Sequence, residues 1–312
     1  MHFDMTPSGP FSLATEIDFF GGWPAFEAGR ASPAIAFPVE GWRGSALVVM
    51  RQAEGGTITG EVRGVAADAG EDADAAGAWQ QALATVSLDV DGSGWPAVGQ
   101  RDATLGQLQA KYSYLRPVLF HSPYEAAAAF IIGHRISIQQ GRNLRQAMAK
   151  EFGDKIEAGG APYYAFPRPQ VLAGLTAVKG LNAQKIERLH GVAQAALEGW
   201  LDRRELRAMP VEQALQKLRT LHGVGEFFAQ GILYRGAGLV DEITDDDVTP
   251  QAVQKAYQLT ELPDRQAVLA RAEAWRPYRM WATVMLHAWL RREAGGPVRP
   301  GGHGPRRSPK AA

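Results

Sequence analysis

The sequence lacks cysteine altogether, and it lacks the usual marks of a membrane, secreted or metal-dependent protein. Without cysteine there are no disulfides, no thiolate-held iron–sulfur clusters and no cysteine nucleophile. No apolar run approaches the roughly 20 residues of a membrane span, and the opening MHFDMTPSGPF lacks the basic and apolar regions of a signal peptide. The seven histidines never show the HExxH spacing. We therefore expect a cytoplasmic protein with no membrane partner, no cofactor and no metal ligated by side chains.

The chain has no net charge, but its two parts carry opposite net charges. Residues 1–100 hold 4 Lys+Arg and 13 Asp+Glu, whereas residues 101–312 hold 29 and 20, so the two parts carry −9 and +9. A basic C-terminal part favours contact with a polyanion. The alternative is that two ordinary domains simply differ in charge.

Hydrophobic periodicity divides the chain into a β-rich part and a helical part. Alternating or β-branched runs predict strands at 13–18, 45–51, 57–63 and 85–90, with a helix near 79–83. From about Leu108 the period becomes helical. We expect an α+β fold with an N-terminal antiparallel-sheet domain (1–107), an all-α domain (108–294) and a disordered basic tail (295–312).

Capping residues locate several helices of the second part. Ser122, with Pro123 and Glu125 behind it, is a helix start with a capping box. Asn182 is a second N-cap. Further helices are expected after Pro210 and over residues 279–292.

The most informative stretch is a Gly-Val-Gly turn between two helices. Gly223 and Gly225 allow a tight turn and close approach of another molecule, and the second helix then presents unpaired N–H groups that suit a phosphate oxygen. An ordinary glycine C-cap between packed helices is the alternative. Beyond this hairpin the chain reads DEITDDDVTP, residues 241–250, before another helix.

Together these features resemble the helix-hairpin-helix superfamily of DNA glycosylases, and most closely the DNA-3-methyladenine glycosylase II family. Other matching segments follow in the right order over roughly residues 3 to 293: PYEAAAAFIIGHRIS at 123–137, GLNAQKI at 180–186, WRPYR at 275–279 and LHAW at 286–289. The resemblance implies a monomeric enzyme of base-excision repair that binds double-stranded DNA containing damaged, alkylated bases.

The resemblance also assigns roles to residues. Asp247 takes the catalytic position and Asp246 is the next choice, because three consecutive aspartates leave the register open by one residue. Gly223, Val224 and Gly225 would grip the DNA backbone, and the base-displacing wedge aligns near Arg135, beside His134. The alternative for the acidic run is that it caps a helix starting at Pro250.

For the base pocket, the matching residues are Phe227, Trp289 and Phe19, whose aromatic faces would attract a cationic alkylated purine. Trp281 and Met285 are expected in the core. Bifunctional relatives carry a lysine where this chain has Phe227, so the sequence implies hydrolysis without strand cleavage. A structural cation at the hairpin carbonyls is also implied, and it would need no particular side chain.

Two further functions stay open at this point. One is a DNA-binding module without catalysis, which would use the same hairpin and basic surface. The other is a metal-dependent phosphoesterase with Glu242, Asp245, Asp246 and Asp247 as oxygen ligands.

Overall fold

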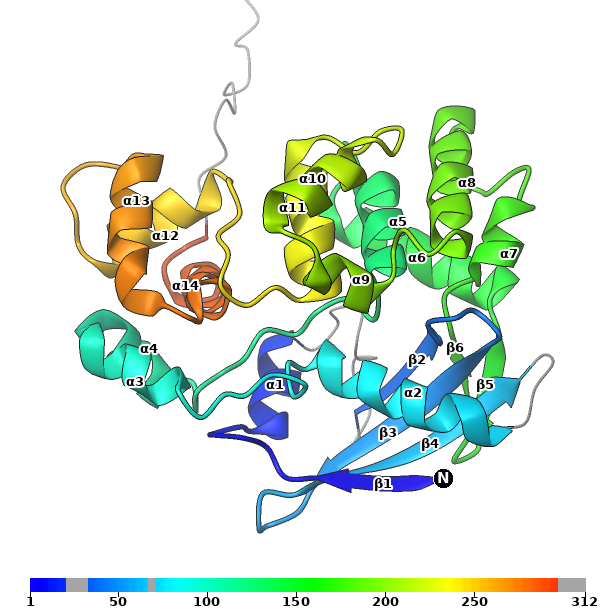
Figure 1. Cartoon of the computed structure of the whole chain (residues 1–312), viewed down its shortest axis with the longest axis horizontal. Helices are drawn as coiled ribbons and strands as arrows, with labels where there is room; N and C mark the ends of the chain where they lie inside the picture. Colours follow the sequence, from blue (N-terminus) through cyan, green and yellow to red (C-terminus); the bar gives the residue numbers. More distant parts are fainter. Residues whose placement is uncertain (21–32, 67–70, 297–312) are drawn as a thin grey trace, which may run out of the picture.

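The structure is a computed structural model that describes residues 1–20, 33–66 and 71–296, without the side chains of residues 19–20, 65–66 and 71–74. An antiparallel sheet in the order β1-β4-β3-β2 forms its β part, and a separate hairpin pairs β5 with β6 (Figure 1). The strands are β1 (His2–Met5), β2 (Ala34–Pro38), β3 (Gly44–Gln52), β4 (Ile58–Ala66), β5 (Lys155–Ala158) and β6 (Ala161–Tyr164).

Helices make up most of the remainder. They are α1 (Leu13–Phe20), α2 (Glu71–Thr85), α3 (Trp95–Arg101), α4 (Ala103–Lys111), α5 (Pro123–Gly133), α6 (Ile138–Phe152), α7 (Pro169–Ala173), α8 (Ala183–Leu197), α9 (Arg203–Ala208), α10 (Val211–Arg219), α11 (Glu226–Gly231), the π-helix η1 (Ile232–Ala237), α12 (Val248–Ala256), α13 (Arg265–Ala272), the 3₁₀ turn η2 (Glu273–Trp275) and α14 (Arg279–Glu293).

Two large hydrophobic cores hold these elements together. The first lies between the sheet and α2, which crosses it in Figure 1, and it is built on residues such as Val48, Val62 and Trp79. The second fills the helical part. Helices α3 and α4 belong to the second core, because Trp95 packs on Trp281 with ring centroids 5.7 Å apart.

Asp102 fixes α4 to the C-terminal helices. Its carboxylate caps α4 at the backbone N–H of Leu105, and its second oxygen accepts from the hydroxyl of Tyr257 at 2.6 Å and from the indole N–H of Trp275 at 3.0 Å. Residues 95–111 therefore pack with the last helices of the chain rather than with the sheet that precedes them.

Several predicted elements are confirmed and others are wrong. The strands at 45–51 and 57–63 lie in β3 and β4, and the helix at 79–83 lies in α2. Residues 13–18 are helical instead, because Ser12 caps α1 and Leu13 packs into the sheet core. The strand expected at 85–90 is the end of α2 and a turn. The second part is not purely helical, since it contains the β5-β6 hairpin.

The predicted helix starts are confirmed at the level of hydrogen bonds. Ser122 accepts from the N–H of Glu125 at 3.1 Å, and Asn182 accepts from that of Lys185 at 2.9 Å. The carboxylate of Glu125 lies against His121 Nδ1, 3.1 Å away, rather than closing the expected capping box. Helices α10 and α14 begin after Pro210 and at Arg279, as predicted.

The fold is thus mixed: helices with a small antiparallel sheet. Within the described residues, no helix combines the length and the apolar content needed to cross a bilayer. From residue 297 on, the tail predicted to be disordered lies outside the described residues.

Candidate DNA-binding hairpin and acidic site

The hairpin consists of α10, a turn over residues 220–225 and α11. Gly223 has φ +88°, and a Cβ there would lie 2.6 Å from Cδ of Arg188, so only glycine fits. Gly225 is exposed and extended, and a Cβ there would meet nothing within 4 Å. Val224 is only 6% exposed. Its side chain is therefore core, and only its backbone can face a ligand.

The second helix of the hairpin lies very close to α5. A Cβ on Gly231 would lie 2.3 Å from the ring of Phe130, and one on Gly236 would lie 2.8 Å from Cβ of Ala126. The helix runs on as η1 and ends at Gly238, whose φ is +83°. A π-helix is rare and is often found near functional sites. These contacts fix the hairpin as a rigid element.

Basic residues lie around the turn that follows α5. The ammonium of Lys185 donates to the carbonyls of Ile132 and His134 at 2.7 and 2.9 Å, which fixes the turn after α5. Partial burial lowers the pKa of His134, and the nearby charges of Arg135, Arg188 and Lys185 lower it further. His134 and Arg135 are predicted from the sequence, whereas Arg188 has no local sequence signal, because only the fold brings it to the hairpin.

Arg135, the residue aligned with the wedge, is exposed and has φ +59°. A left-handed conformation at a non-glycine residue turns the chain sharply at this point. His134 beside it packs its ring edge-on against Phe228, with centroids 5.6 Å apart. The turn therefore presents Arg135 outward, next to the hairpin.

The aromatic residues expected in the pocket have different environments. Phe227 is 49% exposed, and its ring lies edge-on to Phe130 at 6.2 Å. Trp289 is partly buried on α14. The side chain of Phe19 lies outside the described residues, although its neighbour Asp18 forms an ion pair with Arg292 at 2.8 Å and so places α1 beside α14. Trp281 and Met285 are buried in the core, as predicted.

The three aspartates of the acidic run point to different partners. Asp245 is exposed, and its carboxylate pairs with Arg265 at 2.8 Å. Asp247 is exposed at the N-cap position of α12 and makes no side-chain cap. The side chain of Asp246 is only 12% exposed. One of its oxygens accepts from the backbone N–H groups of Val248 and Thr249, both at 2.7 Å.

The helix that follows therefore starts at Val248, two residues earlier than expected, and Asp246 caps it. The other oxygen of Asp246 accepts from the hydroxyl of Thr249 at 3.1 Å. The acidic run is also joined to the hairpin, because the backbone N–H of Asp245 donates to the side-chain oxygen of buried Gln230 on α11 at 2.7 Å. The hairpin and the acidic run are thus connected by the side chain of Gln230.

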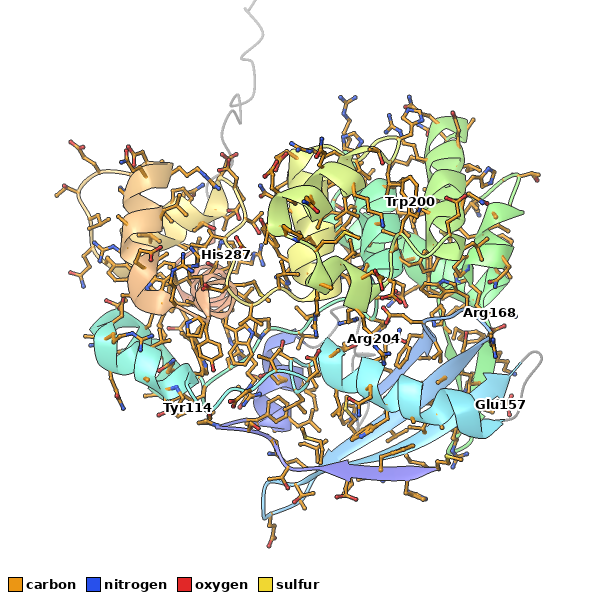
Figure 2. All side chains as sticks on the ribbon, in the orientation of Figure 1. Tyr114, Glu157, Arg168, Trp200, Arg204 and His287 are labelled. Atoms are coloured by element: carbon orange, nitrogen blue, oxygen red, sulfur yellow. The ribbon has the colours of Figure 1, made fainter. Side chains whose placement is uncertain are left out.

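His287, which is labelled in Figure 2, lies on α14. Its Nε2 is 2.9 Å from the Thr249 hydroxyl and 3.8 Å from the carboxylate of Asp246. Burial lowers the pKa of His287 to about 4, although the charge of Asp246 opposes the shift; Arg291 and Arg235 add to it. The imidazole is consequently neutral near pH 7.

The four acids considered as metal ligands do not converge. Asp245 turns to Arg265, and Asp246 turns to its helix. Glu242 lies 4.0 Å from Arg279, and burial raises its pKa. In the part of the chain that the structure describes, no group of three or more histidine and acidic side chains is placed to hold a metal ion.

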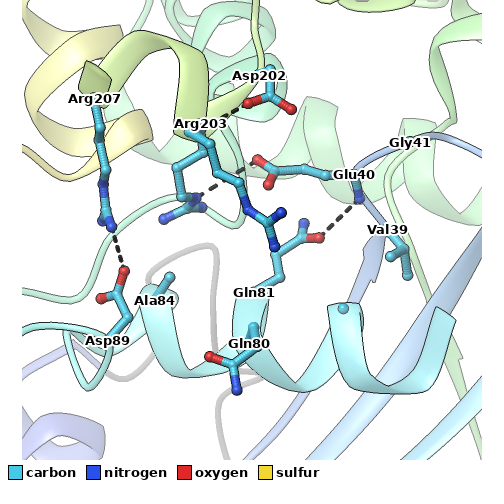
Figure 3. A pocket seen from close by; sticks show the side chains of 12 residues that line it. Val39, Glu40, Gly41, Gln80, Gln81, Ala84, Asp89, Asp202, Arg203 and Arg207 are labelled. Atoms are coloured by element: carbon cyan, nitrogen blue, oxygen red, sulfur yellow. Dashed lines mark hydrogen bonds and ion pairs between the residues drawn. The ribbon is translucent and has the colours of Figure 1, made fainter. Parts of the chain in front are cut away.

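A separate cavity of about 380 Å³ lies between α2 and α9 (Figure 3). Its charged side chains are largely paired with one another: Arg207 with Asp89 at 2.6 Å, and Arg203 with Glu40 at 3.6 Å. These pairs join the sheet part to the helical part. The cavity includes none of the hairpin or acidic-run residues, and we assign it no role in the site.

Solved structures share this architecture over nearly the whole chain. A 3-methyladenine DNA-glycosylase from Archaeoglobus fulgidus superposes with a TM-score of 0.74 at 21% identity, covering 93% of this chain and 98% of that one. An 8-oxoguanine glycosylase/lyase from Clostridium acetobutylicum in complex with double-stranded DNA gives 0.65 at 15% identity, covering 93% and 97%. The chain therefore has the fold of these DNA glycosylases.

Two relatives found by sequence are DNA-3-methyladenine glycosylases. The chain is 24% identical over 204 residues to the DNA-3-methyladenine glycosylase of Bacillus subtilis, covering 64% of this chain and 67% of the relative. It is 30% identical over 194 residues to DNA-3-methyladenine glycosylase 2 of Escherichia coli, covering 60% and 64%. The chain thus spans about two thirds of the length of these relatives. No family model matches the sequence. The chain is thus similar over about two thirds of its length to bacterial DNA-3-methyladenine glycosylases.

Proposed function

We propose that the chain is a monofunctional DNA glycosylase, which hydrolyses the N-glycosidic bond of alkylated purines in double-stranded DNA. The observation that carries this proposal is the placement of Asp246. Its carboxylate is almost buried and accepts hydrogen bonds from two backbone amides and a hydroxyl. The neighbouring residue, Asp245, donates its backbone N–H to Gln230 of the hairpin, which is of a type that suits phosphate binding. The names of the curated relatives support the same reaction and the same substrate class.

The chemistry needs one fixed negative charge. Breaking the N-glycosidic bond leaves positive charge on the sugar, and a carboxylate near C1′ stabilises it and orients or deprotonates the attacking water. Of the two candidates, we favour Asp246 over Asp247. Low exposure strengthens its electrostatic effect, and its hydrogen bonds fix its geometry in advance. Asp247 is exposed, where water would screen its charge.

The two carboxylate oxygens of Asp246 differ in how many hydrogen bonds they accept. Its first oxygen already accepts from two amides, whereas the second accepts from the Thr249 hydroxyl at 3.1 Å. A carboxylate oxygen has two lone pairs. We infer that the second oxygen faces the sugar of the everted nucleotide.

The hairpin would hold the DNA backbone through the amides at Gly223, Val224 and Gly225. The basic residues around it, His134, Arg135 and Arg188, would add charge, with Arg135 inserted where the base leaves the stack. Phe227, Trp289 and Phe19 remain our proposal for the pocket, with cation–π attraction to a methylated purine as the source of selectivity. A cation at the hairpin carbonyls also remains a proposal.

Two finer points follow from the same reasoning. Phe227 stands where a strand-cleaving relative carries its lysine, so we propose no lyase activity. For the domain organisation, we propose a sheet domain followed by a helical glycosylase domain. The packing of α3 and α4 on the last helices favours a boundary earlier than residue 107. The monomeric state and the cytoplasmic location stay predictions from the sequence.

The test is direct. The full chain is incubated with DNA methylated by dimethyl sulfate, with and without EDTA, and the products are separated by chromatography. We expect release of a free methylated purine at equal rates in both arms, with strands cut only after alkaline treatment. Binding to DNA without base release would favour the non-catalytic module, and a loss of activity in EDTA would favour the metal-dependent reaction.

A further inference from the structure

The carboxylate of Asp246 is the end of a short chain of hydrogen bonds that runs into α14. Thr249 Oγ1 lies 3.1 Å from the second carboxylate oxygen and 2.9 Å from Nε2 of His287. Thr249 is 3% exposed, and the side chain of His287 is 14% exposed. Both groups are therefore largely shielded from water, and their hydrogen bonds depend mainly on each other.

The direction of these bonds follows from counting protons. An ionised carboxylate only accepts, so the single hydroxyl proton of Thr249 goes to Asp246. The hydroxyl oxygen must then accept from the ring, which requires the proton of His287 to sit on Nε2. Burial lowers the pKa of His287 to about 4, which keeps the ring in the neutral form near pH 7.

From this geometry we propose that Thr249 and His287 are positioning residues for Asp246, forming a relay in which His287 Nε2–H donates to Thr249 and Thr249 donates to the carboxylate. The proposal rests on the proposed function, because it assigns a role to the two residues that contact the carboxylate proposed for base release. Neither residue touches the substrate. Their effect is to fix the rotamer of the carboxylate.

A neutral histidine suits this task better than a cation. The transition state carries positive charge on the sugar, and an imidazolium behind Asp246 would partly cancel the negative charge that stabilises it. The charged groups that face His287 are Asp246 from the loop, Arg291 from its own helix and Arg235 from η1. The two arginines disfavour protonation, so the ring donates a hydrogen bond without adding charge.

Relay variants test the proposal through their pH–rate profiles. Thr249→Val keeps the shape and removes the hydroxyl, whereas Thr249→Ser keeps the hydroxyl. We expect single-turnover release of methylated purine to fall about tenfold in the valine variant, or ~1.4 kcal/mol of transition-state stabilisation, with the DNA Kd unchanged. The acid limb of the pH–rate profile should shift to higher pH, because the ionised carboxylate has lost a donor. The serine variant should restore the wild-type rate and the wild-type pH–rate profile.

A second measurement does not depend on activity. Nitrogen-15 NMR of the histidine rings at pH 7, assigned by comparison with His287→Phe, reports the tautomer directly. We expect His287 as the neutral Nε2–H form. A neutral Nδ1–H form or a protonated ring would overturn the relay, as would a valine variant with the wild-type rate and profile. Failure of the wild-type chain to release any base would overturn the proposed function instead.

Discussion

The hairpin turn and the acidic run are neighbours with opposite environments. At the turn, Gly225 is exposed, and a Cβ there would meet no atom within 4 Å. In the acidic run, Asp246 is almost buried and is held by α12 and α14. In the proposed function, DNA binding would rely on an open surface of fixed backbone shape, and base release would rely on a side chain shielded from water. Variants at the two places should accordingly fail in different ways.

The largest expected effect is at the buried carboxylate. Asp246→Asn keeps the shape and the capping oxygen but removes the charge, so base release in single turnover should fall about a thousandfold or more, ~4 kcal/mol of transition-state stabilisation. DNA affinity should stay within about twofold. Asp247→Asn is the matched control, and we expect its rate within about threefold of the wild type. The reverse ranking would assign the reaction to Asp247.

A smaller effect should appear in the pH dependence of the free energy of unfolding, and it arises from His287 at the same buried site. The pKa of His287 is lowered from 6.5 to about 4 in the folded chain, so between these values only the unfolded chain binds the proton. The free energy of unfolding should therefore fall as pH drops from about 6.5 to 4, by on the order of 2 kcal/mol.

Denaturant unfolding at several pH values measures this loss. His287→Phe cannot bind the proton, so its stability should vary less over that window. His222→Phe removes an imidazole whose side chain is 61% exposed, and it should retain the wild-type dependence. Equal pH dependence in all three proteins would contradict the burial of a neutral His287.

A substitution in the exposed hairpin turn should affect DNA binding alone. Gly225 has an extended backbone with no atom near a Cβ, so Gly225→Ala should fold normally. Its methyl group would point into the space that a DNA phosphate needs, and we expect about a tenfold weaker Kd. The release rate at saturating enzyme should change less than twofold. Gly64→Ala, at another open glycine, should leave both quantities unchanged.

The smallest effect concerns a single charge beside the hairpin. Arg188→Ala should weaken DNA binding about threefold to fivefold and reduce the slope of log Kd against log salt by about one. Arg204→Ala removes an exposed arginine beside the separate cavity instead and should change neither. An unchanged salt slope in the Arg188 variant would exclude a phosphate contact there.

The same two regions show what could be predicted from the sequence. Local signals located the hairpin, because glycines, caps and helical periodicity act over a few residues. They also located several helix starts, such as those at Ser122 and Asn182. The expected strand at residues 13–18 was wrong because packing of Leu13 against the sheet favoured a helix. The β5-β6 hairpin gave no clear alternating signal.

The acidic run was predictable only as a group. Which aspartate is buried depends on His287, which follows Thr249 by 38 positions in the chain and reaches it only when α14 packs on α12. Arg188 similarly meets Gly223 only after folding. Local patterns carry no information about such contacts, so neither the burial of Asp246 nor its link through Thr249 to His287 could be predicted from the sequence.

The most direct test of the central claim is a crystal structure of the Asp246→Asn variant bound to duplex DNA containing a single N7-methylguanine. The distances to compare are those from C1′ of the everted nucleotide to the side-chain oxygens of residues 246 and 247. We expect residue 246 at about 3.5 Å, the separation of groups poised to react, and Asp247 turned to solvent. Asp247 next to C1′, with residue 246 directed only at its helix, would contradict the account.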